Sequence, residues 1–200
     1  MTLTLPDTAA LGDAGHITDH NLITAALADL DARGSGLDLI ATAALSGASV
    51  SINGCFTTDY DTYKVLISHG YGSSGGNLLM RLRAAGSDAS AGNYNYETLQ
   101  GYLATAPYAG NYASQTSMRL GSVGTAVGTG VYVSADFFGP KLAQPTAVIA
   151  QHNANPAAPI VEHWHGFLND SSAYDGLTVY PSDGPWSGGT IKIFGYRNSL

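Results

Sequence analysis

The sequence is poor in charged residues, and glutamate is almost missing from it. Charged residues occupy 12% of the 200 positions, about half the share found in an ordinary soluble domain. Only two of the 15 acidic residues are glutamate, Glu97 and Glu162, and Lys and Arg together number 8. Because Glu, Lys and Arg populate exposed helix faces, long surface helices are largely excluded.

The scarcity of basic residues also excludes a class of partners. The formal net charge is −7, and no stretch of the chain gathers Lys and Arg into a cluster. Proteins that bind nucleic acid neutralise backbone phosphates with such clusters. We therefore expect no nucleic-acid partner.

Cysteine and long apolar runs are equally scarce. The single cysteine, Cys55, excludes a disulfide framework and a paired-cysteine zinc site. With no basic neighbour to lower its pKa, Cys55 is expected to be a small buried residue. No run of 18 apolar residues is present, and the first residues lack the basic start and apolar stretch of a secretory signal. We expect no membrane insertion.

Glycine and tyrosine, by contrast, are abundant, with 25 and 12 residues respectively. From Leu37 onward, short runs of alternating character are separated by Gly, Asn, Asp, Ser and Pro, which is typical of strands and turns. In Asn77–Ala84, for example, Leu78, Met80 and Leu82 share one face. The pattern predicts a mainly β protein, an antiparallel sandwich of jelly-roll-like type. The predicted strands are Asp38–Leu45, Ala48–Ile52, Thr62–Ser68, Asn77–Ala84, Gln115–Gly121, Gly130–Phe138, Thr146–His152, Ile160–Leu168, Leu177–Tyr180 and Thr190–Tyr196.

The first 36 residues differ from the rest, and Thr18–Ala32 is the one segment whose pattern predicts a helix. Thr18 or Asp19 can cap its N-terminal end, and the Gly-Ser-Gly that follows ends it. Its apolar face follows a heptad spacing that is too short to hold as an isolated coiled coil. This apolar face either contacts the same helix in other copies of the chain, which another part of the chain holds together, or it packs on the chain's own β domain. The heptad residues are His20, Ile23, Leu27 and Leu30.

The stretch Ser87–Ser114 does not fit the rhythm of the other strands. It is too long for a hairpin turn, and a loop of this length is usually functional or partly structured. Tyrosines among Gly, Asn and Ala make good recognition surfaces, so we take them as candidate ligand-binding residues together with Trp164. The alternative is that they are strand residues that pack between subunits. The tyrosines are Tyr94, Tyr96, Tyr102, Tyr108 and Tyr112.

The histidines offer the one hint of a metal site. His163 and His165 flank Trp164, and an H-x-H motif on a strand places both imidazoles on one face. His152 could add a third ligand, but no carboxylate-rich surroundings are apparent. Packing or an interface role is the alternative, and we predict neither a metal nor a cofactor.

Catalytic motifs are also missing. A serine nucleophile on a G-x-S-x-G turn is absent, and the glycine-rich Gly70–Gly76 has no lysine and opens no helix. This segment is predicted to be a hairpin connection. Converging aspartates of a carbohydrate-processing enzyme have no positive support in the sequence. We predict that the chain is not an enzyme.

Three segments resemble bacteriophage proteins. The opening TLTLPDTAALGDAGHITDHNLITAALADLDA resembles the N-terminal segment of tailed-phage appendage proteins, with a G-D-x-G-H-x-x-D-H-N core at Gly12–Asn21. Leu37–Gly70, LDLIATAALSGASVSINGCFTTDYDTYKVLISHG, is similar to the start of the β domain in small tail-fibre, minor-tail and head-fibre proteins. Tyr174–Leu200, YDGLTVYPSDGPWSGGTIKIFGYRNSL, is similar to their closing strand pair. Trp186 and Phe194 in it are expected to be core residues.

The resemblance implies a homotrimeric virion protein that contacts other capsid or tail proteins. Residues 1–17 would be the virion-anchoring arm, 18–36 the helical neck with its hinge, and 37–200 the β-sandwich head. The heptad residues would then line the trimer neck, and the head would bind host-surface carbohydrate. The alternative is a capsid decoration protein that stabilises the shell without binding a receptor. The anchoring residues would be Leu5, Leu11, Gly12 and His16.

Overall fold

The computed structural model describes residues 21–26, 36–102, 106–154 and 160–197. Residues 21–26 are helical, in agreement with the predicted helix, and the rest of that helix lies outside the described residues. A separate compact unit runs from Leu37 to Ser199, and all strands belong to it. None of the described helices is long and apolar enough to cross a membrane.

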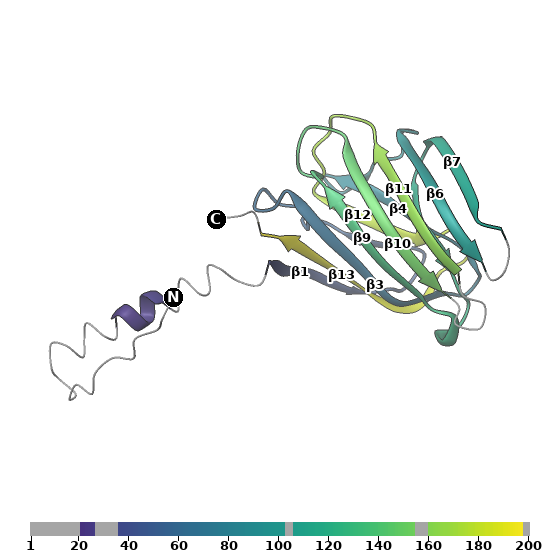
Figure 1. Ribbon diagram of the computed structural model, residues 1–200, viewed down its shortest axis with the longest axis horizontal. Helices are drawn as coiled ribbons and strands as arrows, with labels where there is room; N and C mark the ends of the chain where they lie inside the picture. The colour runs from purple at the N-terminus through teal and green to yellow at the C-terminus, as the bar shows by residue number, and fades with distance from the viewer. Residues whose placement is uncertain (1–20, 27–35, 103–105, 155–159, 198–200) are drawn as a thin grey trace. The chain divides into compact units, whose positions relative to one another are not determined.

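The strands form two antiparallel sheets, so the predicted antiparallel β-sandwich is confirmed (Figure 1). The large sheet has eight strands in the order β1-β13-β3-β9-β10-β11-β6-β7. Its strands are β1 (Leu37–Ala44), β3 (Thr62–Gly72), β6 (Tyr94–Tyr102), β7 (Tyr108–Gln115), β9 (Val131–Phe138), β10 (Thr146–Ala154), β11 (Ile160–Leu168) and β13 (Trp186–Tyr196).

The small sheet has the order β2-β12-β4, and two further strands share the remaining side of β4. β8 pairs with Gly76–Met80 of β4, and β5 pairs with its last two residues. A short 3-10 turn, Val127–Thr129, follows β8. The strands are β2 (Val50–Ile52), β4 (Gly76–Ala84), β5 (Ser87–Asp88), β8 (Met118–Val123) and β12 (Gly176–Pro181).

Eight of these strands are connected as a jelly roll. The first strand pairs with the last, β1 with β13, and the next pairs inward along the chain are β2 with β12, β3 with β9 and β4 with β8. This nested pairing is that of a long hairpin rolled into two facing sheets. Strands β10, β11, β6 and β7 extend the large sheet beyond β9, and we call these four strands the extension.

The core lies between the sheets and follows the alternation seen in the sequence. Leu78, Met80 and Leu82 of β4 are fully buried, as predicted, while the residues between them are half-buried. Ile191 and Ile193 of β13 face them from the large sheet side of the core, also fully buried. Trp186 belongs to the core, as predicted, but the prediction for Phe194 was wrong, because it is half-buried on the opposite face of β13 from Ile191 and Ile193.

Two predictions about connections were wrong. The stretch Ser87–Ser114 is not a loop, because it contains β5, β6 and β7. Its tyrosines therefore belong to strands, as the alternative stated, whereas packing between subunits stays a prediction. Gly70–Gly76 does not close a hairpin, because β3 lies in the large sheet and β4 in the small one. It crosses between the sheets instead.

Candidate functional site: the outer face of the large sheet

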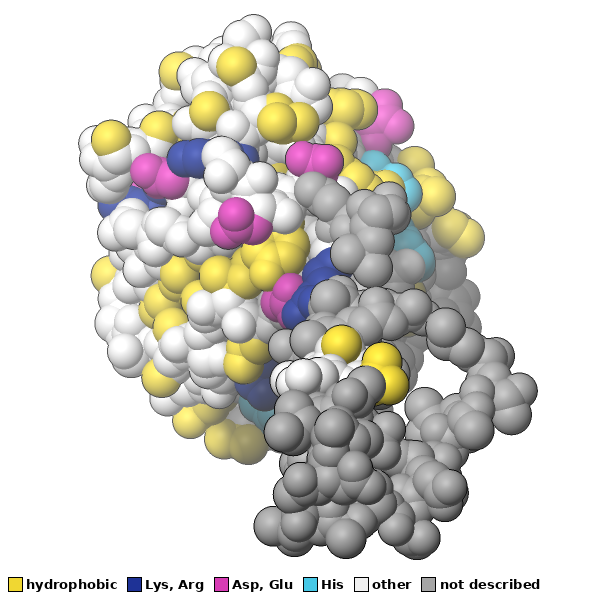
Figure 2. Space-filling view, turned by 90° about the vertical axis from the view of Figure 1, so that its left-hand side faces the viewer, with side chains coloured by type: hydrophobic (Ala, Val, Ile, Leu, Met, Phe, Trp, Pro, Cys, Tyr) yellow, Lys and Arg dark blue, Asp and Glu magenta, His cyan; other side chains and the backbone are white. Residues whose placement is uncertain are grey.

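The face of the large sheet that points away from the core is rich in exposed hydrophobic side chains. An open antiparallel sheet face is ordinarily polar, so large apolar side chains there mark a contact surface. Charged side chains are sparse in the sequence, and on the face shown in Figure 2 several of them lie next to a side chain of opposite charge, with uncharged surface between these groups. The exposed hydrophobic residues on this face are Leu37, Leu39, Leu99, Tyr132, Phe138, Ile149, Val161 and Phe167.

Strand register aligns the side chains of this face into rows that run across the sheet. Each residue in a row is the direct partner of the next, so their Cβ atoms lie about 5 Å apart. One row, from β3 to β7, is Leu66, Ser134, Gln151, His163, Leu99 and Ala109. The next row is Lys64, Asp136, Ile149, His165, Glu97 and Asn111.

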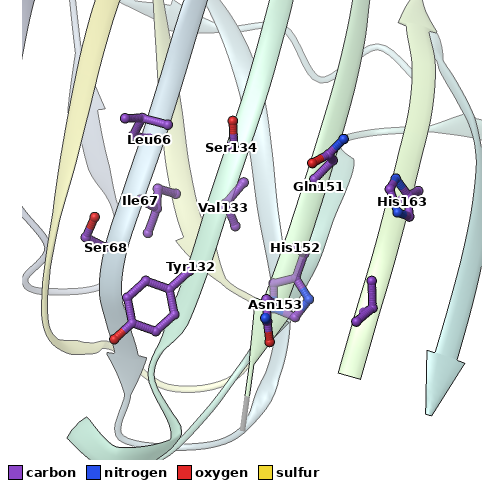
Figure 3. Close-up of a pocket in the computed structure, with 11 residues that line it drawn as sticks. Leu66, Ile67, Ser68, Tyr132, Val133, Ser134, Gln151, His152, Asn153 and His163 are labelled. Atoms are coloured by element: carbon purple, nitrogen blue, oxygen red, sulfur yellow. The ribbon is translucent and has the colours of Figure 1, made fainter. Parts of the chain in front are cut away.

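A groove of about 450 Å³ lies where the extension joins the jelly roll (Figure 3). It crosses β3, β9, β10 and β11, and small residues such as Ser134 form its floor between larger neighbours. Its volume lies within the range of small-molecule sites. The outward side chains that line it are Leu66, Ser68, Tyr132, Ser134, Gln151, Asn153, Val161 and His163.

One exposed aromatic ring dominates the groove. Tyr132 is 46% exposed, and the ring of His69 contacts it edge-on with centroids 4.8 Å apart. His69 has a φ of 54° and lies where the register of β3 and β9 shifts, so a β-bulge aims its ring at Tyr132. The tyrosine is thus supported on one side and open on the other.

Neutral hydrogen-bonding groups surround this ring. Gln151 and Asn153 are exposed on β10, and each amide offers both donors and an acceptor. His163 stands across from Gln151 on β11. An open aromatic ring beside paired amides can hold a flat, hydroxyl-rich ligand by stacking and hydrogen bonds without a charge of its own.

Two further hollows of similar size continue along the extension, with volumes of about 410 and 470 Å³. Both are lined by Glu97, Asn111 and His165, and the first of them also by His163. The Asn111 amide donates to Glu97 at 2.9 Å, which joins β7 to β6 on this face. The surface is therefore a series of grooves rather than one deep pocket.

The structure separates the three histidines considered as metal ligands. His163 and His165 share the outer face, as the H-x-H spacing predicts, but His152 points into the core. Within the described ranges, no three His, Cys, Asp or Glu side chains come together as a metal-binding group. The proposed third ligand, His152, is thus excluded from that set by its position.

Behind the groove, the carboxylate of Glu162 is completely buried and fully engaged. Its Oε1 accepts hydrogen bonds from Gln100 at 2.7 Å, Arg119 at 3.2 Å and Ser122 at 3.2 Å. Its Oε2 accepts the indole N–H of Trp164 at 2.9 Å. One carboxylate thus connects β6, β8 and β11, which satisfies the rule that buried charge is paired.

His152 completes this buried cluster from β10. Its Nδ1 lies 3.3 Å from Oε2 of Glu162 but is not aligned for a hydrogen bond. Its Nε2 lies 3.0 Å from the carbonyl oxygen of Ser122. Gly121 leaves room for this ring, because a Cβ at that position would overlap the imidazole.

The surroundings of Glu162 keep it ionised. Burial by itself raises the pKa of the carboxyl, but the neighbouring His152, the charge of Arg119 and the Trp164 N–H outweigh it. The pKa is therefore below its ordinary value. Arg119 also lies over the Trp164 ring, 4.6 Å from its centroid, so the cation is held by both the carboxylate and the ring.

The cluster does not have the connectivity of a catalytic triad. In a triad, the serine hydroxyl donates to the histidine and the carboxylate orients that histidine. Here the Ser122 hydroxyl donates to Glu162, and His152 contacts the backbone of Ser122 instead. Glu162 and His152 alternate along their strands with Gln151 and His163, which face outward, so the cluster packs behind the groove.

The predicted ligand-binding tyrosines are placed mostly away from solvent. Tyr94, Tyr96 and Trp164 are buried, so the expectation that they bind a surface ligand is wrong. Tyr112 is half-buried and stacks on Tyr96 with centroids 5.0 Å apart. Tyr108 alone of the set that can be assessed is well exposed, at 51%. Tyr102 is the last residue of β6, and its side chain lies outside the description.

Most predicted anchor and neck residues cannot be assessed in the same way. Ile23 lies in the helical segment and is 45% exposed. The remaining ones lie outside the described residues and stay predictions. They are Leu5, Leu11, Gly12, His16, His20, Leu27 and Leu30.

Tyr132, Gln151 and Asn153 were not among the residues predicted to bind a ligand. A signal was present, because Val131, Val133 and Ala135 alternate with Tyr132 and Ser134 in a predicted strand. Alternation identifies the outward face of each strand but not which strands are neighbours. The groove depends on β10 pairing with β9, which strand patterns alone did not predict.

Comparisons of the chain with protein-family models, curated proteins and solved structures return no match. The site is therefore interpreted from its own geometry.

Proposed function

We propose that the protein is a bacteriophage structural protein, a homotrimeric fibre or spike of the virion, whose β-sandwich head binds carbohydrate on the host cell surface. The N-terminal segment would anchor it to capsid or tail proteins, as the sequence resemblance implies. No catalytic step is part of this proposal. Three heads on one appendage would convert weak single-site binding into strong attachment.

The observation that carries the carbohydrate-binding role is the groove beside Tyr132. A half-exposed aromatic ring can stack on the apolar face of a sugar, and the amides of Gln151 and Asn153 can bond to its hydroxyl groups. None of the described residues that line the groove is Lys or Arg, so its chemistry favours an uncharged glycan.

The test uses the full chain on an array of bacterial surface glycans, with Tyr132→Ala as the variant. Phe138→Ala is the matched control, because Phe138 lies on the same strand and face, 39% exposed, outside the groove. We expect Tyr132→Ala to weaken binding about tenfold or more and Phe138→Ala to leave it unchanged. A wild-type chain that binds no glycan, or equal loss in both variants, would overturn the carbohydrate-binding role.

The trimer is tested separately by light scattering of the full chain. We expect the mass of three chains or a multiple of three, each of 20.6 kDa. A monomeric mass at micromolar concentration would contradict the trimer and leave the glycan result standing on its own.

The exposed apolar residues on the extension favour a second candidate, capsid decoration. Leu99, Val161 and Phe167 are each about half exposed or more, which is typical of a surface that contacts protein. A decoration protein would stabilise particles without affecting adsorption. Particles that lack the protein should then lose heat resistance but adsorb normally, whereas the receptor-binding role predicts the reverse.

A further inference from the structure

Strand β7 is the last strand of the large sheet, and one of its edges has no partner among the strands that the structure describes. Among the strands that the structure describes, only β6 pairs with β7, and Figure 1 shows β7 as the last strand at that side of the sheet. Its sequence, YAGNYASQ, has no charged residue and no proline. A long edge strand without these features presents its free N–H and C=O groups as a template for another strand.

The other edges of the sandwich carry features that discourage pairing. β1 lies at the opposite end of the large sheet, and its register with β13 shifts between Leu39 and Ala41. It also carries the charged Asp38, whose carboxylate accepts hydrogen bonds from Nε and Nη2 of Arg197. In the small sheet, the edge strands β2 and β5 have three and two residues. Bulges, charges and short length are the usual ways to protect an edge. β7 has one irregularity near its end, where its register with β6 shifts between Tyr94 and Tyr96 and Ser114 has a φ of 54°, and the pairing from Tyr108 to Tyr112 is regular.

The side chains of β7 also leave room for a neighbour. Ala109, Asn111 and Ala113 face outward, and the inward Tyr108 and Tyr112 are exposed and half-buried respectively. Tyr108 and Tyr112 approach each other with hydroxyl oxygens 3.4 Å apart. A strand added at this edge would meet small residues on one face and these two rings on the other, which favours cross-strand aromatic packing.

We propose that β7 pairs with β7 of a second copy of this chain, antiparallel, across a twofold axis normal to the sheet. An antiparallel strand is self-complementary, so one segment supplies both sides of the contact. The neutral strand also suits self-pairing in a chain of net charge −7, because no like charges on β7 would oppose each other. The two large sheets would continue as one, with both outer faces on the same side.

This inference does not depend on the proposed carbohydrate site. It adds a contact between heads, and the groove near Tyr132 stays open because the contact lies on the far edge of the extension. In a trimeric appendage, a twofold contact of this kind would join heads of neighbouring trimers.

The test is cross-linking of the full chain carrying Asn111→Cys, treated with a bis-maleimide of about 10 Å span. If the twofold axis passes beside Gly110, Asn111 or Tyr112, so that this residue pairs with its own copy, the Cβ atoms of the two introduced cysteines would lie within about 8 Å of each other. The native Cys55 is 1% exposed and does not compete for the reagent. We expect most of the chain to run as a cross-linked dimer on a denaturing gel.

Thr42→Cys is the matched control, because it places an exposed cysteine on the outer face of the opposite edge strand, β1. A second variant adds Ala109→Lys and Ala113→Lys to Asn111→Cys, which places like charges across the pairing edge. We expect at least a fivefold lower dimer yield in both. An Asn111→Cys yield no higher than that of Thr42→Cys, or a yield unaffected by the two lysines, would overturn the proposal.

Discussion

Glu162 is one of only two glutamates in the chain, and it is the one that the fold encloses completely. Its carboxylate is surrounded by His152 on β10, Arg119 on β8 and Trp164 on its own strand. A buried charge with several donors is costly to disturb, because removing it leaves those donors unpaired. The residue therefore links the two sheets at the place where the extension meets the jelly roll.

Substitution of Glu162→Gln is expected to lower the free energy of unfolding at pH 7 by about 2–4 kcal/mol. The folded-state pKa of Glu162 is lowered, so its stabilising effect is present above the unfolded pKa of about 4.3 and is lost as pH falls through the folded value. The difference between wild type and variant should hence shrink below about pH 4.5. Urea unfolding curves from pH 7 to pH 3 measure it.

Glu97→Gln is the matched control, because it removes the same charge from an exposed position on the neighbouring strand. We expect it to change the free energy of unfolding by about 0.5 kcal/mol or less at pH 7. A Glu162→Gln penalty that stays constant with pH would show that the lost contacts, not the ionised carboxylate, stabilise the fold.

At the level of the strand, β11 shows how sharply the two faces of the large sheet differ. Phe167 is 55% exposed on the outer face, whereas the next residue, Leu168, is 2% exposed and belongs to the core. Large-to-small substitution in a core leaves a cavity, but truncation of an exposed ring does not. Phe167→Ala should cost about 0.5 kcal/mol or less, and Leu168→Ala about 2–4 kcal/mol. Chemical denaturation of both variants tests the register, and equal losses would contradict it.

Strand patterns predicted the jelly-roll strands well because their residues follow the rule of alternation. β4 and β13 both place Leu, Met or Ile on the inward positions, and the buried residues are the ones expected. β6 and β7 were not predicted, since Gly101, Gly110 and the asparagines among their tyrosines are typical of loops. They form strands because tertiary packing of Tyr94, Tyr96 and Tyr112 compensates for weak local preference.

The candidate site was predicted less well than the fold. The H-x-H spacing predicted that His163 and His165 share one face of the strand, which is confirmed. The rings predicted to bind a ligand, however, include buried ones such as Trp164. A tyrosine on a strand is equally compatible with core and surface until the partner strands are known. The groove arises from the order β3-β9-β10-β11, and that order is a long-range property of the chain.

The compact unit Leu37–Ser199 is a jelly roll whose large sheet is widened by two insertions. β6 and β7 are inserted between the paired strands β4 and β8, and β10 and β11 between β9 and β12. The added strands, or their junction with the jelly roll, carry the grooves and the free edge of β7. They also carry the exposed hydrophobic residues Leu99 and Phe167. The jelly roll thus supplies a scaffold, and the insertions supply the surfaces that can make contacts.

This division predicts that the β unit folds without residues 1–36. Every core residue that the structure describes comes from the compact unit Leu37–Ser199, so a chain of residues 37–200 should keep its near-ultraviolet circular dichroism and unfold cooperatively. A chain of residues 43–200 is the matched control, because it also removes most of β1 and its pairing with β13. We expect the first to melt within about 5 °C of the full chain and the second well below it. A non-cooperative transition for residues 37–200, together with strong binding of a hydrophobic dye, would show that the sandwich needs the N-terminal segment to fold.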